Sequence, residues 1–310
     1  MGSSTMSAIG YPVYSAMETA ELLPFDLLVQ QLKTAVRQYG NGQIVSPERS
    51  VTRLPSGGLM LSMPSTSDDI VAHKLVNVCS ANRKLGLPTI FGTVTAFDPV
   101  TGAPLFVLDG PTVTGRRTAA VTMLAISVLL GTPRDAVLIG TGKQAAYHAE
   151  AFAALFPDTL LLVKGTTERS SADFVDSHRH IVPRLQAAPE GQLPDNSQLV
   201  ITLTTSKTPV YSEPARADRL VVGVGAFTPD AAEVGRTTIQ GSTLVVDDPA
   251  GARHEAGDLI QAGVDWSSVK SLADVLSAPL PSGQPVFFKS VGCSAWDLAA
   301  CRVARDKRAN

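Results

Sequence analysis

A glycine-rich segment at residues 135–145 constrains the fold more than any other part of the sequence. It reads Asp-Ala-Val-Leu-Ile-Gly-Thr-Gly-Lys-Gln-Ala, so an apolar run typical of a buried strand leads directly into Gly-x-Gly-x-x-Ala. The first glycine permits a sharp turn, the second lets the backbone approach a pyrophosphate, and the small third residue lets the following helix pack on the sheet. The phosphates then meet the helix N-terminus, where unpaired N–H groups and the helix dipole favour anions.

The segment therefore predicts a dinucleotide site. An ordinary strand-to-helix turn is the alternative interpretation. It is weakened by the apolar strand at 136–139 and by the helical sequence from about 143 to 156, which give the glycines the required context. The residues expected to contact the cofactor phosphates are Gly140, Thr141, Gly142, Lys143 and Gln144.

The end of the second predicted strand indicates which nicotinamide cofactor is bound. In NAD sites, an acidic residue about 20 residues beyond the glycines holds the ribose hydroxyls. Here the strand at 159–163 runs into Lys-Gly-Thr-Thr-Glu-Arg, and the strand ends on a lysine. A cation and hydroxyls suit a 2′-phosphate, so we predict NADP(H) in preference to NAD(H), with a solvated polar turn as the alternative. The residues expected to bind this phosphate are Lys164, Thr166, Thr167 and Arg169.

Composition narrows the class of partner. The chain has 310 residues, 44% of them hydrophobic, which is enough for a large core. Its formal charge is 26 − 28 = −2 without a long basic tract, which argues against nucleic acid or an anionic membrane as a partner. The longest apolar stretch, 119–131, is too short to span a bilayer and predicts a buried helix. We expect a small-molecule ligand.

The cysteines and histidines indicate neither a disulfide framework nor a metal site. Cys79, Cys293 and Cys301 are odd in number and widely spaced, so we expect a reduced, cytoplasmic protein. His178 and His180 fall in a predicted helix, where a spacing of two directs their rings to different faces. Residues 1–8 are expected to form a flexible leader.

The pattern of elements predicts an α/β fold. A capping box at Ser15-x-x-Glu18 opens a helical region that extends to Gly40, with a break at Pro24. Strand-like runs follow at 51–54, 59–63, 70–77, 90–97 and 104–108. From Thr118 the chain alternates helix and strand, as in a parallel sheet, with strands at 136–139, 159–163, 199–203, 220–224 and 243–246. A late segment at 287–292 precedes a last helix from about 294 to 305. We predict a Rossmann-type parallel-sheet domain joined to a mixed α+β domain.

Several cations in the first half of the chain are candidates for substrate binding. Arg49 follows Pro-Glu, Lys74 lies in a strand-like run, and Arg116 and Arg117 open an apolar helix. Each is individually typical of a surface charge or an ion pair. If the two domains face each other across a cleft, these cations can bind a carboxylate, since a guanidinium grips it at two points.

A series of short segments extends in order along nearly the whole chain and resembles the ornithine cyclodeaminase and mu-crystallin family. Each segment is a weak signal alone, but the ordered set is specific. The segments are Pro47-Glu-Arg49, Met63-Pro-Ser65, Lys74-Leu-Val-Asn77, Thr95-Ala-Phe97, Arg117-Thr-Ala-Ala120, Ile139-Gly-Thr-Gly-Lys-Gln144, Pro229-Asp-Ala-Ala-Glu-Val234, Asp247-Asp248, Glu255-Ala-Gly-Asp258 and Phe288-Lys-Ser-Val-Gly292.

The resemblance implies a homodimer of two-domain subunits. Residues 1–118 plus 291–310 would bind substrate and form the dimer contact, and residues 119–290 would form the Rossmann domain. Arg49, Lys74 and Arg117 would hold the substrate carboxylate, and Met63 would line the pocket. The turn formed by Ser290, Val291 and Gly292 would approach the nicotinamide.

The chain departs from the deaminating members of that family at two positions. Those members carry a Glu two residues before Met-Pro, where this chain has Leu61. They also carry a catalytic Asp just after the strand that ends at Val224-Gly225, where this chain reads Ala-Phe-Thr from Ala226. Asp230 and Glu233 are nearby, but we interpret their Pro-Asp-x-x-Glu motif as the start of a helix.

Without those acids, reduction of a preformed imine is favoured over cyclodeamination, which needs positioned proton carriers. The reductase branch of the family, which includes mu-crystallin and bacterial cyclic ketimine reductases, also tends to lack the ribose-binding acid. We therefore predict hydride transfer from NADPH to C2 of pyrroline-2-carboxylate or piperideine-2-carboxylate, giving L-proline or L-pipecolate. Lys74 would be catalytic if it delivers or stabilises the imine proton.

Three alternatives remain open from the sequence. The chain could be an ornithine cyclodeaminase that uses NAD, or an amino-acid dehydrogenase of the alanine type. It could also be a nonenzymatic protein that binds NADPH and a small ligand, as mu-crystallin-type proteins do.

Overall fold

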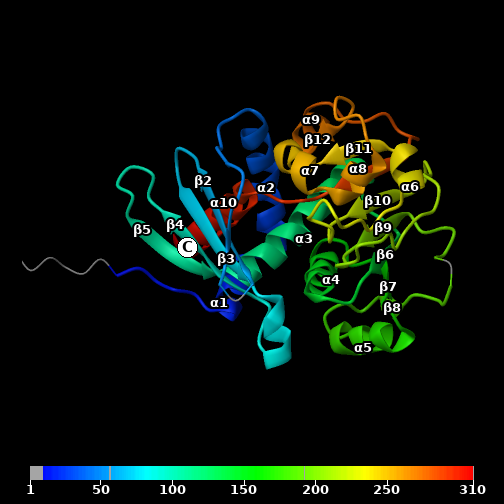
Figure 1. The fold of residues 1–310 in the computed structure, drawn as a ribbon, viewed down its shortest axis with the longest axis horizontal. Coiled ribbons are helices and arrows are strands. Elements are labelled where there is room, and N and C mark those ends of the chain that lie inside the picture. Colours follow the sequence, from blue (N-terminus) through cyan, green and yellow to red (C-terminus); the bar gives the residue numbers. More distant parts are fainter. Residues whose placement is uncertain (1–9, 56, 192, 310) are drawn as a thin grey trace, which may run out of the picture.

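The computed structural model describes residues 10–55, 57–191 and 193–309, and it contains two separate β-sheets in two lobes (Figure 1). The leader expected at residues 1–8 lies outside the described residues. The predicted α/β class, with one parallel and one antiparallel sheet, is confirmed.

The first lobe is built on an antiparallel sheet of five strands in sequential order. Two helices precede it, and they break at Pro24, whose ring cannot supply the N–H that a continuous helix needs. Its elements are α1 (Ala16–Leu22), α2 (Phe25–Gly40), β1 (Ser50–Arg53), β2 (Leu59–Thr66), β3 (Val71–Val78), the 3₁₀ helix η1 (Ser80–Leu85), β4 (Ile90–Phe97) and β5 (Pro104–Asp109).

The second lobe is built on a parallel sheet of eight strands in the order β12-β11-β13-β10-β9-β6-β7-β8. The first six of its strands along the chain are β6 (Asp135–Ile139), β7 (Leu160–Lys164), β8 (Leu185–Ala187), β9 (Leu199–Thr202), β10 (Leu220–Gly223) and β11 (Thr243–Val246). The order reverses beside β6, where crevices form at the carboxyl ends of the strands.

The helices and remaining strands complete the second lobe and its connections. They are α3 (Gly110–Leu129), α4 (Lys143–Leu155), α5 (Glu168–His178), α6 (Arg236–Gln240), α7 (Pro249–Glu255), α8 (Gly257–Ala262), β12 (Lys270–Ser271), α9 (Leu272–Ser277) and β13 (Val286–Lys289). Strands β8 and β12 are too short for a periodic pattern, so the sequence did not reveal them. His180 lies beyond the end of α5.

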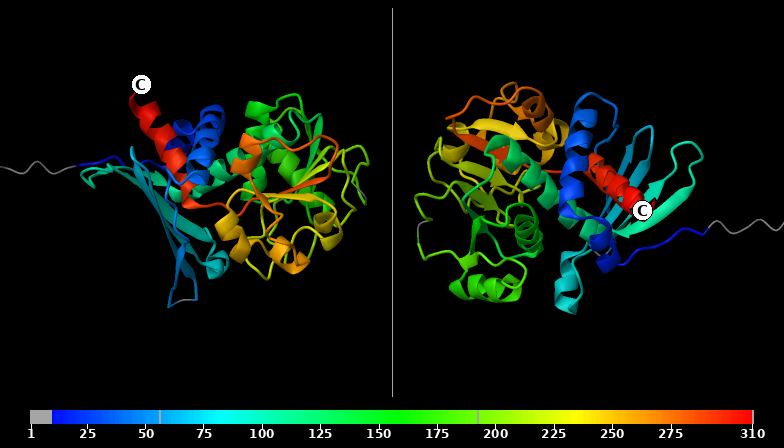
Figure 2. Two further views of the ribbon diagram at one scale, coloured as in Figure 1. Left: turned by 90° about the horizontal axis from the view of Figure 1, so that it is seen from above. Right: turned by 180° about the vertical axis from the view of Figure 1, so that it is seen from behind.

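The last helix, α10 (Ser294–Ala309), leaves the parallel sheet and returns to the first lobe, where it packs on α2, α3, β2 and β3. Figure 2 shows α2 and α10 together on one side of the antiparallel sheet. Trp296 is fully buried in this layer, and Arg302 pairs with Asp69 at 2.6 Å. The end of the chain therefore passes from one lobe to the other directly after β13.

Helix α3 forms the other connection between the lobes. It packs on α2, β4 and β5 of the first lobe and on α4 and β10 of the second. Nearly all of its residues from Thr112 to Ile126 are buried, as expected for the apolar stretch that begins at Ala119. None of the helices within the described residues has the length and apolar character needed to cross a membrane.

Candidate active site

The glycine loop between β6 and α4 has the geometry that a pyrophosphate site requires. Gly140 has a φ of 128°, and an added Cβ would lie 2.6 Å from the carbonyl oxygen of Leu203. Gly142 is the N-cap of α4, no side chain caps the helix, and the space beside its Cα is open. The Gln144 side-chain oxygen is buried without a hydrogen-bond partner in the described part of the chain. The loop therefore offers helix N–H groups and an open cradle, which fit a dinucleotide pyrophosphate.

The residues predicted to bind a 2′-phosphate lie beside this loop. A Cβ on Gly165 would lie 3.1 Å from the Thr141 methyl group, so the end of β7 adjoins the glycine loop. The Lys164 ammonium donates to the carbonyl oxygen of Gly191 at 2.7 Å, and Thr167 caps α5. Thr166 stands between them in the turn, and the Arg169 side chain is 90% exposed.

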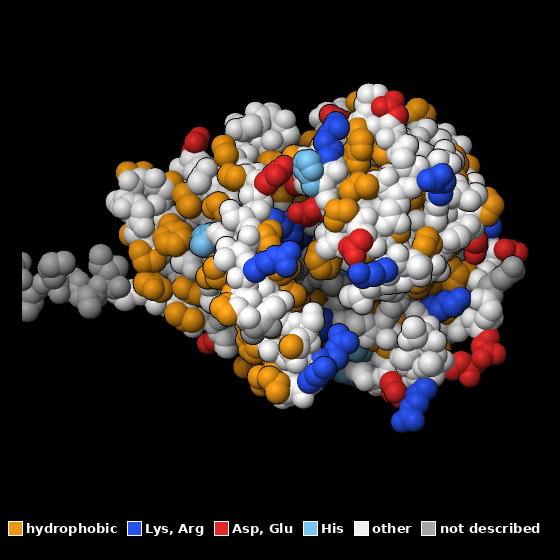
Figure 3. Space-filling model, in the orientation of Figure 1, with side chains coloured by type: hydrophobic (Ala, Val, Ile, Leu, Met, Phe, Trp, Pro, Cys, Tyr) orange, Lys and Arg blue, Asp and Glu red, His pale blue; other side chains and the backbone are white. Residues whose placement is uncertain are grey.

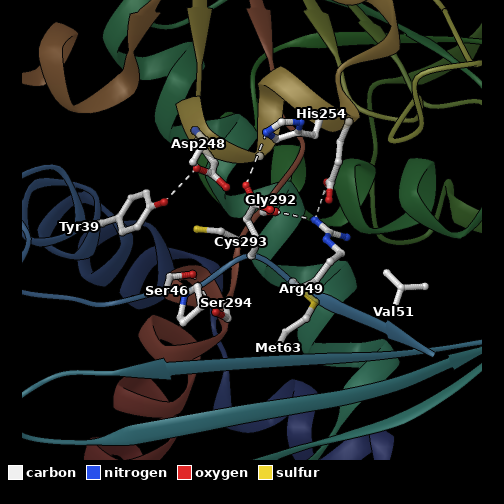
Figure 4. Close-up of a pocket in the computed structure, with 15 residues that line it drawn as sticks. Tyr39, Ser46, Arg49, Val51, Met63, Asp248, His254, Gly292, Cys293 and Ser294 are labelled. Carbon is white, nitrogen blue, oxygen red and sulfur yellow. Dashed lines mark hydrogen bonds and ion pairs between the residues drawn. The ribbon is translucent and has the colours of Figure 1, made fainter.

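A cavity of about 140 Å³ lies between the lobes (Figure 4). Charged side chains gather along this boundary on the surface (Figure 3). The first lobe contributes α2 and the segment that leads from α2 into β1 and β2, while the second contributes α7 and the turn after β13. The lining residues are Tyr39, Ser46, Pro47, Glu48, Arg49, Val51, Met63, Asp248, Ala250, Gly251, His254, Glu255, Gly292, Cys293 and Ser294.

Arg49, Met63 and Gly292 are the predicted substrate or nicotinamide residues that line this cavity. The Arg49 guanidinium lies 2.7 Å from a Glu255 carboxylate oxygen and donates to the carbonyl oxygen of Gly292 at 3.0 Å. Burial raises the pKa of Glu255 to about 7, against the lowering effect of Arg49. The cavity thus places one guanidinium and one readily protonated carboxyl side by side.

Lys74 and Arg117 lie behind the cavity and do not line it. The Lys74 ammonium lies 2.7 Å from one oxygen of Asp297, and the Arg117 side chain donates to the other at 3.3 Å. The side chains of all three are less than a tenth exposed. Burial lowers the pKa of Lys74 to about 8, with Asp297 opposing the shift and Arg117 and Arg49 adding to it.

A single turn brings two of the predicted cations, Arg49 and Arg117, together. Gly292 has a φ of 75°, and a Cβ there would collide with the Arg117 guanidinium, so Arg117 lies directly against the turn while Arg49 donates to its carbonyl. The sequence offered no signal for Asp297, because a single acid in an amphipathic helix is typical of a solvated face.

Asp247 fixes this turn. One carboxylate oxygen accepts from the Val291 N–H at 2.9 Å, and the other accepts from the Ser290 hydroxyl at 2.9 Å and the Gly292 N–H at 3.0 Å. The second oxygen also accepts from the Trp296 indole at 3.2 Å. Asp247 belongs to one of the family motifs in the sequence, but the motif alone indicates no role for it. In the structure, its hydrogen bonds hold residues 290–292 in place.

The interpretation of Pro229-Asp-x-x-Glu233 as a helix start is wrong, because α6 begins later with Gly235 as its N-cap. The buried Glu233 carboxylate accepts from the backbone N–H groups of Thr204, Gly225 and Ala226 at 2.5, 2.6 and 2.8 Å. It therefore joins the carboxyl ends of β9 and β10. Asp230 is exposed and pairs with Lys207 at 2.6 Å.

A second buried carboxylate supports this arrangement. Asp258 accepts from the Glu233 N–H at 2.5 Å and lies 2.7 Å from the ammonium of the fully buried Lys289 at the end of β13. Leu61 pairs with Val76 in the sheet and, two residues from Met63, shares its face. The two positions where deaminating members carry acids are thus occupied by Leu61 and by a buried Ala226.

The parallel sheet with its glycine loop, joined to an antiparallel lobe across a charged cavity, defines a two-lobed dinucleotide-binding α/β protein. The chain belongs to the ornithine cyclodeaminase/mu-crystallin family, whose model matches residues 12–310. The family resemblance carried by the sequence motifs is therefore confirmed.

Curated relatives and solved structures match along almost the whole chain. Delta(1)-pyrroline-2-carboxylate reductase 1 of Burkholderia multivorans is 60% identical over 295 residues, which cover 95% of each chain. The Delta(1)-pyrroline-2-carboxylate/Delta(1)-piperideine-2-carboxylate reductase of Azospirillum brasilense is also 60% identical, again over 95% of each chain. The structure of Thermococcus litoralis Delta(1)-pyrroline-2-carboxylate reductase, solved with NADH and L-proline, has a TM-score of 0.86 at 24% identity and covers 96% of this chain and 97% of that one, so the fold is shared.

Proposed function

We propose that this protein is an NADPH-dependent oxidoreductase that reduces the C=N bond of a cyclic imine carboxylate. The observation that carries the proposal is the cavity in which Arg49 meets the 290–292 turn, while the acid positions used for deamination hold Leu61 and Ala226. The relatives that are 60% identical are named reductases of pyrroline-2-carboxylate, and one name adds piperideine-2-carboxylate.

The residues of the cavity have complementary roles in this proposal. The bound nicotinamide supplies a hydride, and the chain positions the carbon that receives it. Arg49 binds the substrate carboxylate, because its guanidinium is the cation that reaches the cavity. Met63 packs on the ring, and the Asp247-anchored turn holds Ser290, Val291 and Gly292 toward the nicotinamide.

Lys74 and Arg117 add positive charge close to the site where Arg49 would hold the substrate carboxylate. They are held by Asp297 behind the turn, so their charge acts at short range without a direct path to solvent. In a site shielded from water, such fixed charges act more strongly than they would in solution.

The reaction is tested by following the oxidation of NADPH through the loss of its absorbance. We expect activity with pyrroline-2-carboxylate, piperideine-2-carboxylate or both, yielding L-proline or L-pipecolate. Ammonia release from L-ornithine with NAD, in the absence of imine reduction, would instead identify a cyclodeaminase. Consumption of pyruvate and ammonia with NADH would identify an alanine-type dehydrogenase, and NADPH binding without turnover of any substrate would identify a binding protein.

We further propose that NADP(H) is preferred over NAD(H). Lys164, Thr166, Thr167 and Arg169 surround the turn beside the glycine loop, and the end of β7 carries a cation in place of an acid. Lys164→Ala should weaken NADPH binding by about tenfold, the loss of one charge-assisted contact, and leave NADH binding unchanged. Fluorescence titration with both cofactors measures the two affinities, and Lys33→Ala, an exposed substitution on α2, serves as the control. Equal affinities for both cofactors in the unmodified protein would refute the preference.

The uncovered face of the antiparallel sheet supports a homodimer. Residues on the helix-covered face, such as Ala72 and Val94, are buried, and their neighbours point the opposite way. Among the outward positions of β2, β3 and β4, all within the described residues, none is Lys, Arg, Asp or Glu. These positions are Met60, Ser62, Pro64, Thr66, Val71, His73, Leu75, Asn77, Phe91, Thr93, Thr95 and Phe97.

Figure 3 shows hydrophobic side chains concentrated over this sheet. An uncharged sheet face that carries exposed apolar side chains is typical of an interface between subunits. We therefore propose that residues 1–118 plus 291–310 form the substrate-binding and dimerisation domain and residues 119–290 the nucleotide domain. The proposed dimer is cytoplasmic, in keeping with the unpaired Cys79, Cys293 and Cys301.

A further inference from the structure

Glu255 occupies the place in the cavity where a substrate carboxylate would meet Arg49. It is the last residue of α7, its side chain is 20% exposed, and its carboxylate oxygen lies 2.7 Å from the Arg49 guanidinium. The same guanidinium donates to Gly292 in the turn proposed to approach the nicotinamide (Figure 4). A substrate held by Arg49 must therefore displace Glu255 or share the guanidinium with it, and in both cases it lies beside this carboxyl.

The other titratable groups that line the cavity are poorly suited to give up a proton. The Tyr39 hydroxyl already donates to Asp248 at 2.9 Å, and burial raises its pKa further above neutrality. Burial also raises the pKa of Asp248, but its carboxylate accepts from Tyr39 and from the Ala250 N–H at 3.1 Å, and both bonds favour the ionised form. Burial also raises the pKa of the Cys293 thiol. His254 and Glu48 lie 3.6 Å apart with side chains about two-thirds exposed, at the mouth of the cavity. Lys74 does not reach the cavity, because Asp297 holds it behind the turn.

We propose that Glu255 is the acid that protonates the imine nitrogen, and that it takes up its proton when the substrate carboxylate replaces it on Arg49. This inference rests on the proposed imine reduction.

The step balances as follows. The π bond of C=N breaks as a hydride forms the C–H bond at C2, and the proton of the Glu255 carboxyl forms the N–H bond. The nicotinamide is oxidised, the imine is reduced to a secondary amine, and the Glu255 carboxylate regains a proton from water. The amine takes a further proton from water as it leaves.

The surroundings of Glu255 make its carboxyl group easier to protonate than a carboxyl group in water. Arg49 is the cation that faces it, and it stabilises the carboxylate. Burial is the main cause that raises the pKa of Glu255 to about 7 before any substrate binds, and the anions Asp248, Asp247 and Glu48 add to it. A substrate carboxylate on Arg49 adds another negative charge and draws away the stabilising cation, which raises the pKa further.

The test compares Glu255→Gln with the unmodified protein, using NADPH and pyrroline-2-carboxylate between about pH 6 and pH 10. Glutamine keeps the shape and a hydrogen-bond donor but has no acidic proton. We expect kcat to fall about 10²- to 10⁴-fold, the usual contribution of a positioned acid. We also expect the rate of Glu255→Gln to rise as the pH falls, because imine protonated in solution then replaces the missing acid, while kcat of the unmodified protein falls as the pH rises past the pKa of Glu255.

The control is Glu21→Gln, an exposed substitution on α1 in the first lobe, which should match the unmodified protein. A kcat for Glu255→Gln within about threefold of the control, or a rise in KM with an unchanged pH profile, overturns the proposal and leaves Glu255 as a partner of Arg49. If Glu255→Gln loses its folded circular-dichroism spectrum, the pH profile of the unmodified protein decides, since kcat reports the pKa of the substrate complex: a kcat that stays flat up to about pH 10 refutes the role. Inactivity of the unmodified protein would instead refute the proposed function.

Discussion

At the scale of single residues, Asp297 is the carboxylate that pairs with two buried cations. Lys74 and Arg117 approach its two oxygens, and each of these side chains is less than a tenth exposed. Removing one partner from a buried ion pair leaves an uncompensated charge, which is far more costly than losing an exposed pair. Asp297→Ala should therefore lower the free energy of unfolding by about 3–5 kcal/mol, measured by urea denaturation.

The matched control for this substitution is Asp176→Ala. Asp176 pairs with Arg179 on the surface, where both side chains are more than three-fifths exposed. Loss of such a pair should change the unfolding free energy by less than about 1 kcal/mol. Equal effects for the two substitutions would show that Asp297 is not what compensates the charges of Lys74 and Arg117.

At the scale of elements, we expect different roles for the two glycines of the β6–α4 turn: Gly140 is needed for folding and Gly142 for cofactor binding. Gly140 has a φ of 128°, and a Cβ added there would lie 2.6 Å from the backbone oxygen of Leu203. Gly140→Ala should lower the melting temperature by several degrees, because a strained alanine and a backbone contact together cost about 1–3 kcal/mol. Gly142 has a φ of −86° and open space at its Cβ, so Gly142→Ala should keep the melting temperature.

For cofactor binding by the folded protein, the order of the two variants should be reversed: Gly142→Ala should bind NADPH more weakly than Gly140→Ala does. A methyl group on Gly142 projects into the cradle at the N-terminus of α4, where the pyrophosphate is expected, and should weaken NADPH binding at least tenfold in a fluorescence titration. Unchanged affinity in Gly142→Ala would place the phosphates elsewhere.

At the scale of the whole molecule, the proposed dimer depends on the uncharged outer face of the antiparallel sheet. Leu75 lies at the centre of that face, between Ser62 and Thr93 on the neighbouring strands. Leu75→Asp should convert a dimer into a monomer, because two carboxylates would be buried across a symmetric interface. Light scattering after size-exclusion chromatography measures the mass. Val100→Asp, at a turn residue that is 90% exposed in the same lobe, should leave the mass unchanged. A monomeric unmodified protein would contradict the proposal.

Much of the fold follows from local sequence. The run at 135–145 predicts a strand, a tight glycine turn and a helix, and β6 and α4 occupy those positions. The capping box at Ser15 and the break at Pro24 also appear where local chemistry requires them. These features depend on residues within one or two turns of each other, so the sequence contains all of their causes.

The sequence by itself determined the α/β class, the family and the location of the nucleotide loop, because periodicity, glycine spacing and ordered motifs are local properties. The tertiary structure alone decided which groups reach the cavity. Arg49 enters it, Lys74 and Arg117 are drawn behind it by Asp297, and Glu255 arrives from the opposite lobe. Asp297 and Glu255 are far in sequence from the cations they pair with, and the burial that shifts the pKa of Glu255 exists only once the two lobes meet.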